Sequence, residues 1–187
     1  MVGTYDITIL QGATWSLPAR KTETLQTISS ITIASSTVTC TVTSHDYAVS
    51  DKVFVSGADQ DVYNGIQTIL SVADDNTFTY DISYTTIPST PGTGTVTVGR
   101  IVDLTGYTAR MQVRLSTFAS ESLINLTTEN GGIAIDSANG LITCSLSATD
   151  TTALDFFDAV YDLEIMTGST VERLLEGKVK LSREVTK

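Results

Sequence analysis

The sequence predicts an all-β fold, and two features of its 187 residues carry that prediction. Thr, Ser, Val, Ile and Tyr dominate, and β-branched and aromatic side chains suit the pleated, half-buried surface of a strand. Apolar and polar residues also alternate with a period of two in many short segments separated by turn signals, the pattern expected of a β-sandwich. Hydrophobic residues make up 41% and charged residues 17%, so the composition is globular rather than disordered.

The N-terminal segment, residues 4–10, alternates Tyr5, Ile7 and Ile9 with polar side chains and predicts a strand. The segment has no partner close to it in the chain. We therefore expect it to pair with strands that follow residue 100. Trp15, the single Trp, is expected in the core.

The middle of the chain has a strand pattern that is complete in itself. Polar turns separate the strands, one of them around Pro88 and Pro91. Such a set is what a small β-barrel or β-sandwich would need. The five predicted strands span residues 36–44, 51–57, 65–72, 76–83 and 94–100.

These patterns predict a domain insertion. The host is a β-sandwich formed by residues 1–30 and 100–187, and the inserted small β domain is residues 31–99. Insertion is tolerated at exposed loop tips when the two ends leave the host close together. Ser29-Ser30 and Gly99-Arg100 are the expected seams.

The stretch 103–114 shows the clearest alternation in the chain. Gly106 suits a turn, after which Tyr107, Ala109, Met111 and Val113 fall on one face of a strand. The other face is polar and is expected in water or against a partner. A shorter strand is predicted over residues 122–128.

The rest of the host sequence predicts a hairpin and two further strands. The hairpin turns at Asn139-Gly140, where positive φ is tolerated, and carries Ile142 and Cys144 inward on its second arm. Later strands bury alternate residues in the stretches VYDLEIM and VERLLEGKVKLS. The expected inward residues there are Tyr161, Leu163, Ile165, Val179 and Leu181.

One short helix is predicted between these strands. Ser147 and Asp150 have the spacing of a capping box, with Asp in place of the usual Glu or Gln. Ala153, Leu154 and Phe157 are expected to face the core. The helix should have one or two turns and cross the end of the sandwich.

The net charge of −10, from 21 acidic and 11 basic residues, makes nucleic-acid binding unexpected. Nucleic acid repels an acidic surface unless basic residues cluster, and here they are scattered. The acidic balance favours solubility at high local concentration. No apolar run approaches the length of a membrane span, and the N-terminus has no basic lead, so we expect neither a membrane segment nor a signal peptide.

Cys40 and Cys144 are the only cysteines, and each lies in an alternating strand. A disulfide needs their Cα atoms within about 7 Å, which nothing in the pattern supports. We expect two buried free thiols and folding in a reducing cytoplasm.

Two segments contain residues that could belong to a metal-binding or catalytic site, but neither has the required pattern. Asp59 and Asp61 suggest a calcium loop, but Asn64 is displaced by one residue and the twelfth position is Leu70, which excludes an EF-hand. A looser calcium site at Asp59 and Asp61 stays open as an alternative to a solvated turn. His45, the only His, is expected in a loop without a catalytic or zinc-binding role.

Asp155, Asp158, Asp162 and Glu164 form the densest carboxylate group. Glycosidases use a pair of carboxyl groups about 5 to 9 Å apart. Asp162 and Glu164, however, are predicted on the outer face of a strand, and no cleft of exposed aromatic residues is evident. The sequence thus predicts no catalytic, cofactor-binding or metal-binding residues.

The order of several stretches resembles a family of tailed-bacteriophage proteins. It is similar to the Ig-like N-terminal domain of siphophage baseplate upper proteins and to related tail and fibre-attachment proteins. The resemblance covers the two parts of the host, and the inserted segment resembles another small β module of phage virion proteins. The stretches are YDITILQGATW, DLTGYTARMQVR, LTTENGGIAID, GLITCSLSATDTTAL, YDLEI and RLLEGKVKLSREVT.

The resemblance implies a non-enzymatic virion structural protein with an Ig-like host sandwich. Its partners would be other phage virion proteins, such as tail, baseplate, fibre or neck subunits, in multiple copies per particle assembled in the host cytoplasm. A tail, baseplate or fibre-attachment adaptor is the expected role. A head decoration or neck protein is one alternative, and a carbohydrate-binding or carbohydrate-cleaving tail module is another. Family members often have a short hairpin where this chain has its insert.

Overall fold

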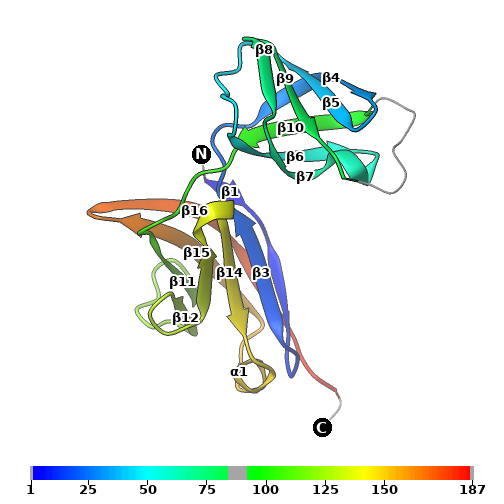
Figure 1. Ribbon diagram of the computed structural model, residues 1–187. Helices are drawn as coiled ribbons and strands as arrows, with labels where there is room; N and C mark the ends of the chain where they lie inside the picture. The colour runs from blue at the N-terminus through cyan, green and yellow to red at the C-terminus, as the bar shows by residue number, and fades with distance from the viewer. Residues whose placement is uncertain (1, 84–91, 186–187) are drawn as a thin grey trace. The chain divides into compact units, whose positions relative to one another are not determined.

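The computed structural model describes residues 2–83 and 92–185, and its regular secondary structure is almost entirely β-strand (Figure 1). The chain divides into two compact units. The host unit is Met1–Lys21 with Leu104–Lys187, and the inserted unit is Thr22–Asp103. The all-β class predicted from the sequence is confirmed. The predicted turn with Pro88 and Pro91 lies outside the described residues.

The host unit is a sandwich of two sheets. The larger, six-stranded sheet has the order β1-β16-β15-β11-β12, with β2 also paired to β16, and the smaller sheet has the order β13-β14-β3. The strands are β1 (Gly3–Thr4), β2 (Ile7–Leu10), β3 (Trp15–Arg20), β11 (Thr108–Arg114), β12 (Ile124–Thr127), β13 (Ile133–Asp136), β14 (Leu141–Leu146), β15 (Asp158–Thr167) and β16 (Thr170–Ser182).

This strand order is that of an Ig-like sandwich. Strands β3, β14 and β13 take the places of strands B, E and D in one sheet. Strands β11, β12, β15 and β16 take the places of C, C′, F and G in the other. Because the inserted unit follows β3 and precedes β11, it occupies the B–C connection of the host.

The N-terminal strands pair with strands after residue 100, as their alternation predicted. Strands β1 and β2 run parallel to β16, and β3 is antiparallel to β14. Between β1 and β2 the chain crosses Gly177 closely, since a Cβ on that residue would lie 2.2 Å from the Tyr5 carbonyl oxygen. The buried Tyr161 hydroxyl donates to the same oxygen at 2.8 Å. Gly177 is thus required for the close approach.

The predicted inward faces of the host strands are largely correct. Ala109, Met111 and Val113 are buried on β11, and Tyr161, Leu163 and Ile165 are buried on β15. Tyr107 lies before the strand, where its N–H donates to Leu104 O in the turn at Gly106. In the hairpin of β13 and β14, Gly140 has φ 57°, the left-handed conformation predicted for the turn.

The short helix forms where predicted, but two of its three predicted core residues, Ala153 and Phe157, are exposed. Helix α1 (Ala148–Thr152) begins with a complete capping box between Ser147 and Asp150. The hydrogen bonds from Ser147 lower the pKa of Asp150. Since the helix ends at Thr152, its periodicity does not extend to Phe157, which is 67% exposed, and the neighbouring Phe156 is buried instead.

The inserted unit is a single curled sheet. Its strand order is β7-β6-β10-β4-β5-β9-β8, and a short 3₁₀ turn, η1 (Asp61–Tyr63), precedes β7. The strands are β4 (Gln26–Ala34), β5 (Thr37–Val42), β6 (Lys52–Ala58), β7 (Gly65–Thr68), β8 (Ser71–Asp74), β9 (Thr77–Asp81) and β10 (Gly94–Arg100).

The segment predicted as one strand, residues 65–72, joins the two ends of this sheet. Its first half, β7, pairs with β6, and its second half, β8, pairs with β9. The buried Ile69 lies between the halves. The two ends of the sheet are therefore joined directly by the chain. Of the two forms predicted for the insert, a small β-barrel or a small β-sandwich, this is the barrel-like one.

The insert begins earlier and ends later than its predicted seams. Ser29-Ser30 lies within β4, which pairs with β5 and β10 of the inserted unit. A β-bulge between Ile28 and Ser30 breaks the period of two there, and this break in the pattern hid the strand. In the structure the unit runs from Thr22 to Asp103.

Backbone hydrogen bonds fix the chain on both sides of each junction between the host and the insert. Within the inserted unit, Thr22 bridges to Ile101, and Glu23 N–H donates to Arg100 O at 2.8 Å. Within the host unit, the two flanking residues bind the turn between β13 and β14. Lys21 N–H donates to Gly140 O at 2.8 Å, and Leu104 N–H donates to Ser137 O at 3.1 Å. The host ends thus meet the same turn.

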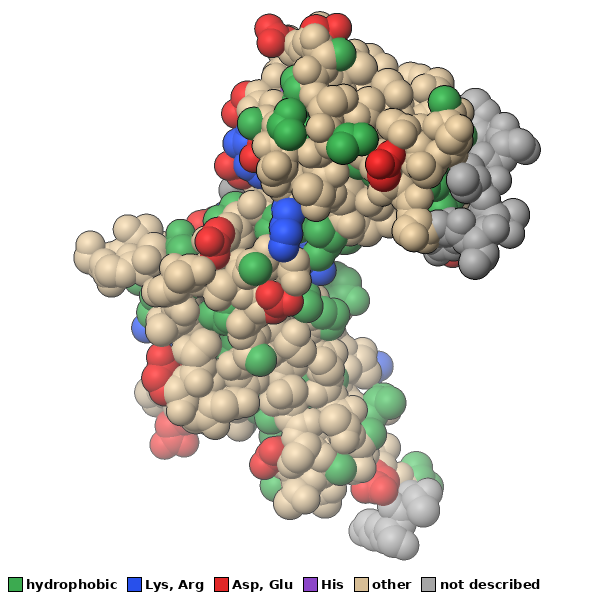
Figure 2. All heavy atoms as spheres, viewed as in Figure 1, with side chains coloured by type: hydrophobic (Ala, Val, Ile, Leu, Met, Phe, Trp, Pro, Cys, Tyr) green, Lys and Arg blue, Asp and Glu red, His purple; other side chains and the backbone are tan. Residues whose placement is uncertain are grey.

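The visible surface is mainly uncharged, with acidic and basic side chains dispersed among hydrophobic side chains, other side chains and backbone atoms (Figure 2). This agrees with the low fraction of charged residues, 17% of the chain. In the part of the chain that the structure describes, no helix has the length and apolarity that a membrane crossing requires.

Candidate functional site

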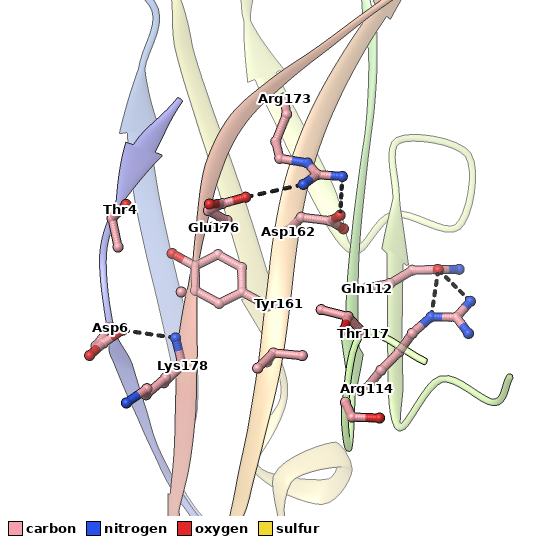
Figure 3. A pocket seen from close by; sticks show the side chains of 13 residues that line it. Thr4, Asp6, Gln112, Arg114, Thr117, Tyr161, Asp162, Arg173, Glu176 and Lys178 are labelled. Atoms are coloured by element: carbon pink, nitrogen blue, oxygen red, sulfur yellow. Dashed lines mark hydrogen bonds and ion pairs between the residues drawn. The ribbon is translucent and has the colours of Figure 1, made fainter. Parts of the chain in front are cut away.

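A groove on the outer face of the six-stranded sheet is the most strongly charged concave surface that we identify. It has a volume of about 570 Å³ and lies over β16, β15 and β11, bordered by the chain between β1 and β2 (Figure 3). Its lining combines three acidic and three basic side chains with polar residues. The lining residues are Thr4, Asp6, Gln112, Arg114, Ser116, Thr117, Val160, Tyr161, Asp162, Arg173, Glu176, Gly177 and Lys178.

One wall of the groove is held by hydrogen bonds to the N-terminal segment. Tyr5 N–H donates to Glu176 O at 2.9 Å, and Lys178 N–H donates to Asp6 Oδ1 at 2.8 Å. Burial raises the pKa of Tyr161 to about 12, so its hydroxyl stays protonated and continues to donate to Tyr5 O. The wall is therefore fixed before any ligand or partner arrives.

Two arginines form ion pairs with three carboxylates at the centre of the face. Arg173 lies 3.1 Å from both Asp162 and Glu176 and 3.7 Å from Glu164, which also pairs with Arg110 at 2.7 Å. The hydrogen bond to Glu176, followed by the charge of Asp162, raises the pKa of Arg173. Such a network orders the face, and it binds the carboxylates instead of leaving a pair free for acid–base chemistry.

The four carboxylates singled out in the sequence do not form one group of paired acids. Asp162 and Glu164 lie on the outer face of β15, as predicted. Asp155 pairs with Arg183, and Asp158 is exposed at the start of β15 opposite Lys180. The arrangement matches a surface of ion pairs.

A loop beside the groove presents two apolar side chains that the sequence did not single out. Phe118 is 97% exposed and Leu115 is 61% exposed, between β11 and β12. The Arg114 guanidinium holds the loop by donating to Ala119 O at 2.6 Å and Ser120 O at 2.7 Å. The signal available in the sequence was a Phe outside any strand pattern, in the stretch LSTFASES.

The second concavity of the host unit has a single charged side chain in its lining. It has a volume of about 590 Å³ and lies between β12 and α1, with Leu126, Leu146 and Leu154 in its lining. It brings together no group of ionisable side chains comparable with the groove; Asp150, its acidic residue, is used in the capping box.

His45 lies in the loop between β5 and β6, as the sequence predicted, and it is buried in the inserted unit. Its ring stacks on Tyr47, with centroids 5.1 Å apart, and meets the edge of Phe78 at 5.5 Å. Nδ1 accepts from Tyr47 N–H at 3.3 Å, and Nε2 has no hydrogen-bond partner among the described residues. The ring serves as part of an aromatic core.

The acidic turn of the inserted unit uses its side chains in local hydrogen bonds. Asp59 Oδ2 accepts from the Thr93 hydroxyl at 2.9 Å, and Asn64 bonds both backbone groups of Ala58. Asp61 lies in the first turn of η1. Across residues 2–83 and 92–185, no group of three or more His, Cys, Asp or Glu residues is placed to hold a metal ion.

Cys40 and Cys144 are buried free cysteines in separate units, as predicted. Burial raises the pKa of each thiol to about 12, which keeps both protonated and unreactive in the folded protein.

Comparison with known protein families and with curated proteins gives no match to this chain.

Proposed function

We propose that this protein is a bacteriophage virion structural protein, a tail, baseplate or fibre-attachment adaptor that acts through protein–protein contacts. The resemblance of the host stretches to Ig-like tail proteins is the starting point. An Ig-like strand order in the host unit is what that resemblance implies, and the topology agrees with it.

The observation that carries the proposal is the insertion of a complete β unit into one connection of the sandwich. Each unit has its own sheet and buried core, and the host ends at Lys21 and Leu104 bind the same turn. A chain built this way offers two separate surfaces from one polypeptide. This arrangement suits a protein that links neighbours in a particle.

The groove supports the same reading. Asp162 and Glu176 in the groove are engaged by Arg173, and a fixed loop next to it exposes Phe118. Interfaces concentrate binding energy in a few aromatic or Arg anchors surrounded by polar contacts. An ordered, mixed-charge face with an exposed aromatic residue at its border has these elements.

The experiment is particle composition and infectivity of phage that carry variants of the gene. Replacing Thr22–Asp103 with a short Gly-Ser bridge should leave a folded host unit, because residues 21 and 104 bind the same turn. Particles that carry this deletion should lose one neighbouring protein or incorporate less of the variant. Absence of the wild-type protein from purified particles would refute the virion role.

A carbohydrate-binding or carbohydrate-cleaving module is the competing class. A glycan array and a reducing-sugar assay on the purified protein separate it from an adaptor. Asp162→Asn and Glu164→Gln, made singly, should leave infectivity nearly unchanged. Normal particles that lose infectivity through either substitution would favour the competing class.

A further inference from the structure

The outer face of the six-stranded sheet has a charge pattern that is complementary to itself. Outward side chains of β16, β15 and β11 that lie opposite one another form rows across the sheet. Two adjacent rows have opposite charge, +2 and −2. The positive row is Lys178, Val160 and Arg114, and the negative row is Glu176, Asp162 and Gln112.

The two cations of the positive row form no ion pair within the described residues, although the Asp6 carboxylate accepts from the backbone N–H of Lys178. Arg114 donates to carbonyl oxygens of the 115–122 loop and to Gln112 Oε1, all of them uncharged. Lys178 has no ion-pair partner in the described part of the chain. In the negative row, the single Arg173 is shared between Asp162 and Glu176. The positive row can therefore form ion pairs with a partner, and the neighbouring row keeps a net negative charge.

We propose that this face binds the same face of a second copy of the chain across a two-fold axis. An axis that lies between the two rows and runs parallel to them sets the positive row of each copy opposite the negative row of the other. A two-fold contact makes each complementary pair twice. The inference rests on the proposed function, since it specifies how copies of a repeated structural subunit would meet.

The charge pattern points to a second copy as the partner of this face, because each row has its complement on the same face of that copy. The chain carries a net charge of −10, so two copies repel each other over most of their surface. The six charged side chains of the groove, in contrast, sum to zero. Complementary potentials fix the register of a contact and suppress unmatched ones. This face is where the repulsion between copies is replaced by attraction.

The two ends of the face supply apolar contacts that the same axis brings together. At one end, the loop after β11 exposes Phe118 and Leu115. At the other end, Val171 lies opposite Met166, and Val171 is 51% exposed. Reversal of the strands about the axis directs the loop of each copy toward the Val171 end of its partner. Phe118, held in place through Arg114, would be the anchor of the contact.

Sedimentation equilibrium of the full chain over a range of concentrations tests the proposal. The wild type should form a dimer. Phe118→Ser and Lys178→Glu should each raise the dimer dissociation constant at least about tenfold, as expected for an anchor and for a charge facing its like. Phe157→Ser is the matched control and should have no effect. Phe157 is also an exposed aromatic residue, but it lies at the Arg183 side chain, 4.7 Å from its guanidinium carbon.

A charge exchange distinguishes the two-fold contact from a general loss of stability. Glu176→Lys alone should weaken the dimer, and the double variant Glu176→Lys with Lys178→Glu should recover it, because the exchanged charges again face opposite charges. Circular dichroism and thermal unfolding check that each variant is folded. Failure of the double variant to recover the dimer would overturn the proposed register.

The proposal and the proposed function fail in different ways. A wild-type protein that stays monomeric at every concentration overturns the two-fold contact, even if the protein is found in particles. A dimer that responds to the variants as expected, in a protein absent from particles, overturns the virion role alone. A dimer weakened as much by Phe157→Ser as by Phe118→Ser would place the contact elsewhere and refute the proposal.

Discussion

The host unit, a sandwich of two sheets, and the inserted unit, a single curled sheet, use charge differently. The host has twelve acidic and nine basic residues, whereas the insert has nine acidic and only two basic residues. Host arginines lie in rows across an exposed sheet face. Both cations of the insert, Lys52 and Arg100, already have partners within the described structure.

This difference indicates separate roles for the two surfaces. A balanced, ordered face can meet a copy of itself, while a surface with excess acid repels one. Arg100 in the insert acts inward instead: it binds Asp51 at 2.8 Å, Glu23 at 3.0 Å and the carbonyl of Asp46 at 2.6 Å. It fastens the strand end next to the passage into the host sequence.

The largest test of this comparison is whether each unit unfolds by itself. Phe78→Ala should destabilise the inserted unit by about 3–5 kcal/mol, because Phe78 is fully buried among His45, Tyr47 and Tyr80. Met111→Ala should cost the host about 2–5 kcal/mol. Calorimetry should show each substitution lowering one transition and sparing the other. A single transition that shifts with either variant would mean that the units unfold as one.

A smaller effect is expected from the two arginine networks. Arg100→Gln should cost the inserted unit about 2 kcal/mol, because it removes charge-assisted hydrogen bonds and leaves carboxylates close together. Arg173→Gln, its counterpart on the exposed host face, should cost less than about 1 kcal/mol. Urea unfolding of both variants measures the contrast. Equal costs would show that the host network contributes to folding as much as the insert network does.

How far the sequence predicted the structure depends on whether the period of two persisted. On β11 it ran uninterrupted, so Ala109, Met111 and Val113 were placed correctly. On β4 the bulge puts both Ile28 and Ile31 inward, three positions apart, and the strand was missed. Local signals such as the capping box and the turn at Gly140 were also sufficient.

The groove could not be predicted from the sequence, because it depends on pairing between strands that are distant in the chain. The outward position of Asp162 could be predicted, but its place beside Arg173 requires the register of β15 against β16, which contains a bulge. The burial of His45 in its loop was not predicted for a similar reason, since it depends on Phe78, which lies on a distant strand. Phe118 lies in a loop, where alternation predicts nothing.

Each unit contains one buried thiol, so the pH dependence of stability can be compared between the two units. Burial raises the pKa of Cys40 and of Cys144 from 9.0 to about 12. Since the folded pKa lies above the unfolded one, the stabilisation is complete below pH 9 and is lost as the pH rises from about 9 to about 12. In that pH range, each buried thiol should lower the free energy of unfolding of its own part of the chain by about 1.4 kcal/mol for every increase of one in pH.

Unfolding at pH 8.5 and pH 10 measures this loss. Cys40→Ala should reduce the pH dependence of the inserted unit only, and Cys144→Ala that of the host unit only. Thiol labelling of the native protein should be slow for both residues until denaturant is added. An intact disulfide in non-reducing mass spectrometry would contradict the free, buried thiols.

The smallest expected effect concerns the capping box of α1, a feature of the host unit. Ser147 Oγ accepts from Asp150 N–H at 3.2 Å, and Asp150 Oδ2 accepts from Ser147 N–H at 3.1 Å. Ser147→Ala removes one of these reciprocal bonds and should destabilise the host by about 1 kcal/mol. Ser145→Ala, an exposed serine on β14, is the control and should have almost no effect.

Because the helix has only five residues, its start is held by this cap and by the Thr151 hydroxyl, which donates to Ala13 O at 2.8 Å. The change should therefore lower the host transition and leave the inserted one in place. A lowered inserted transition would show that a perturbation at one end of the sandwich reaches the other unit, and the two could no longer be treated as independent.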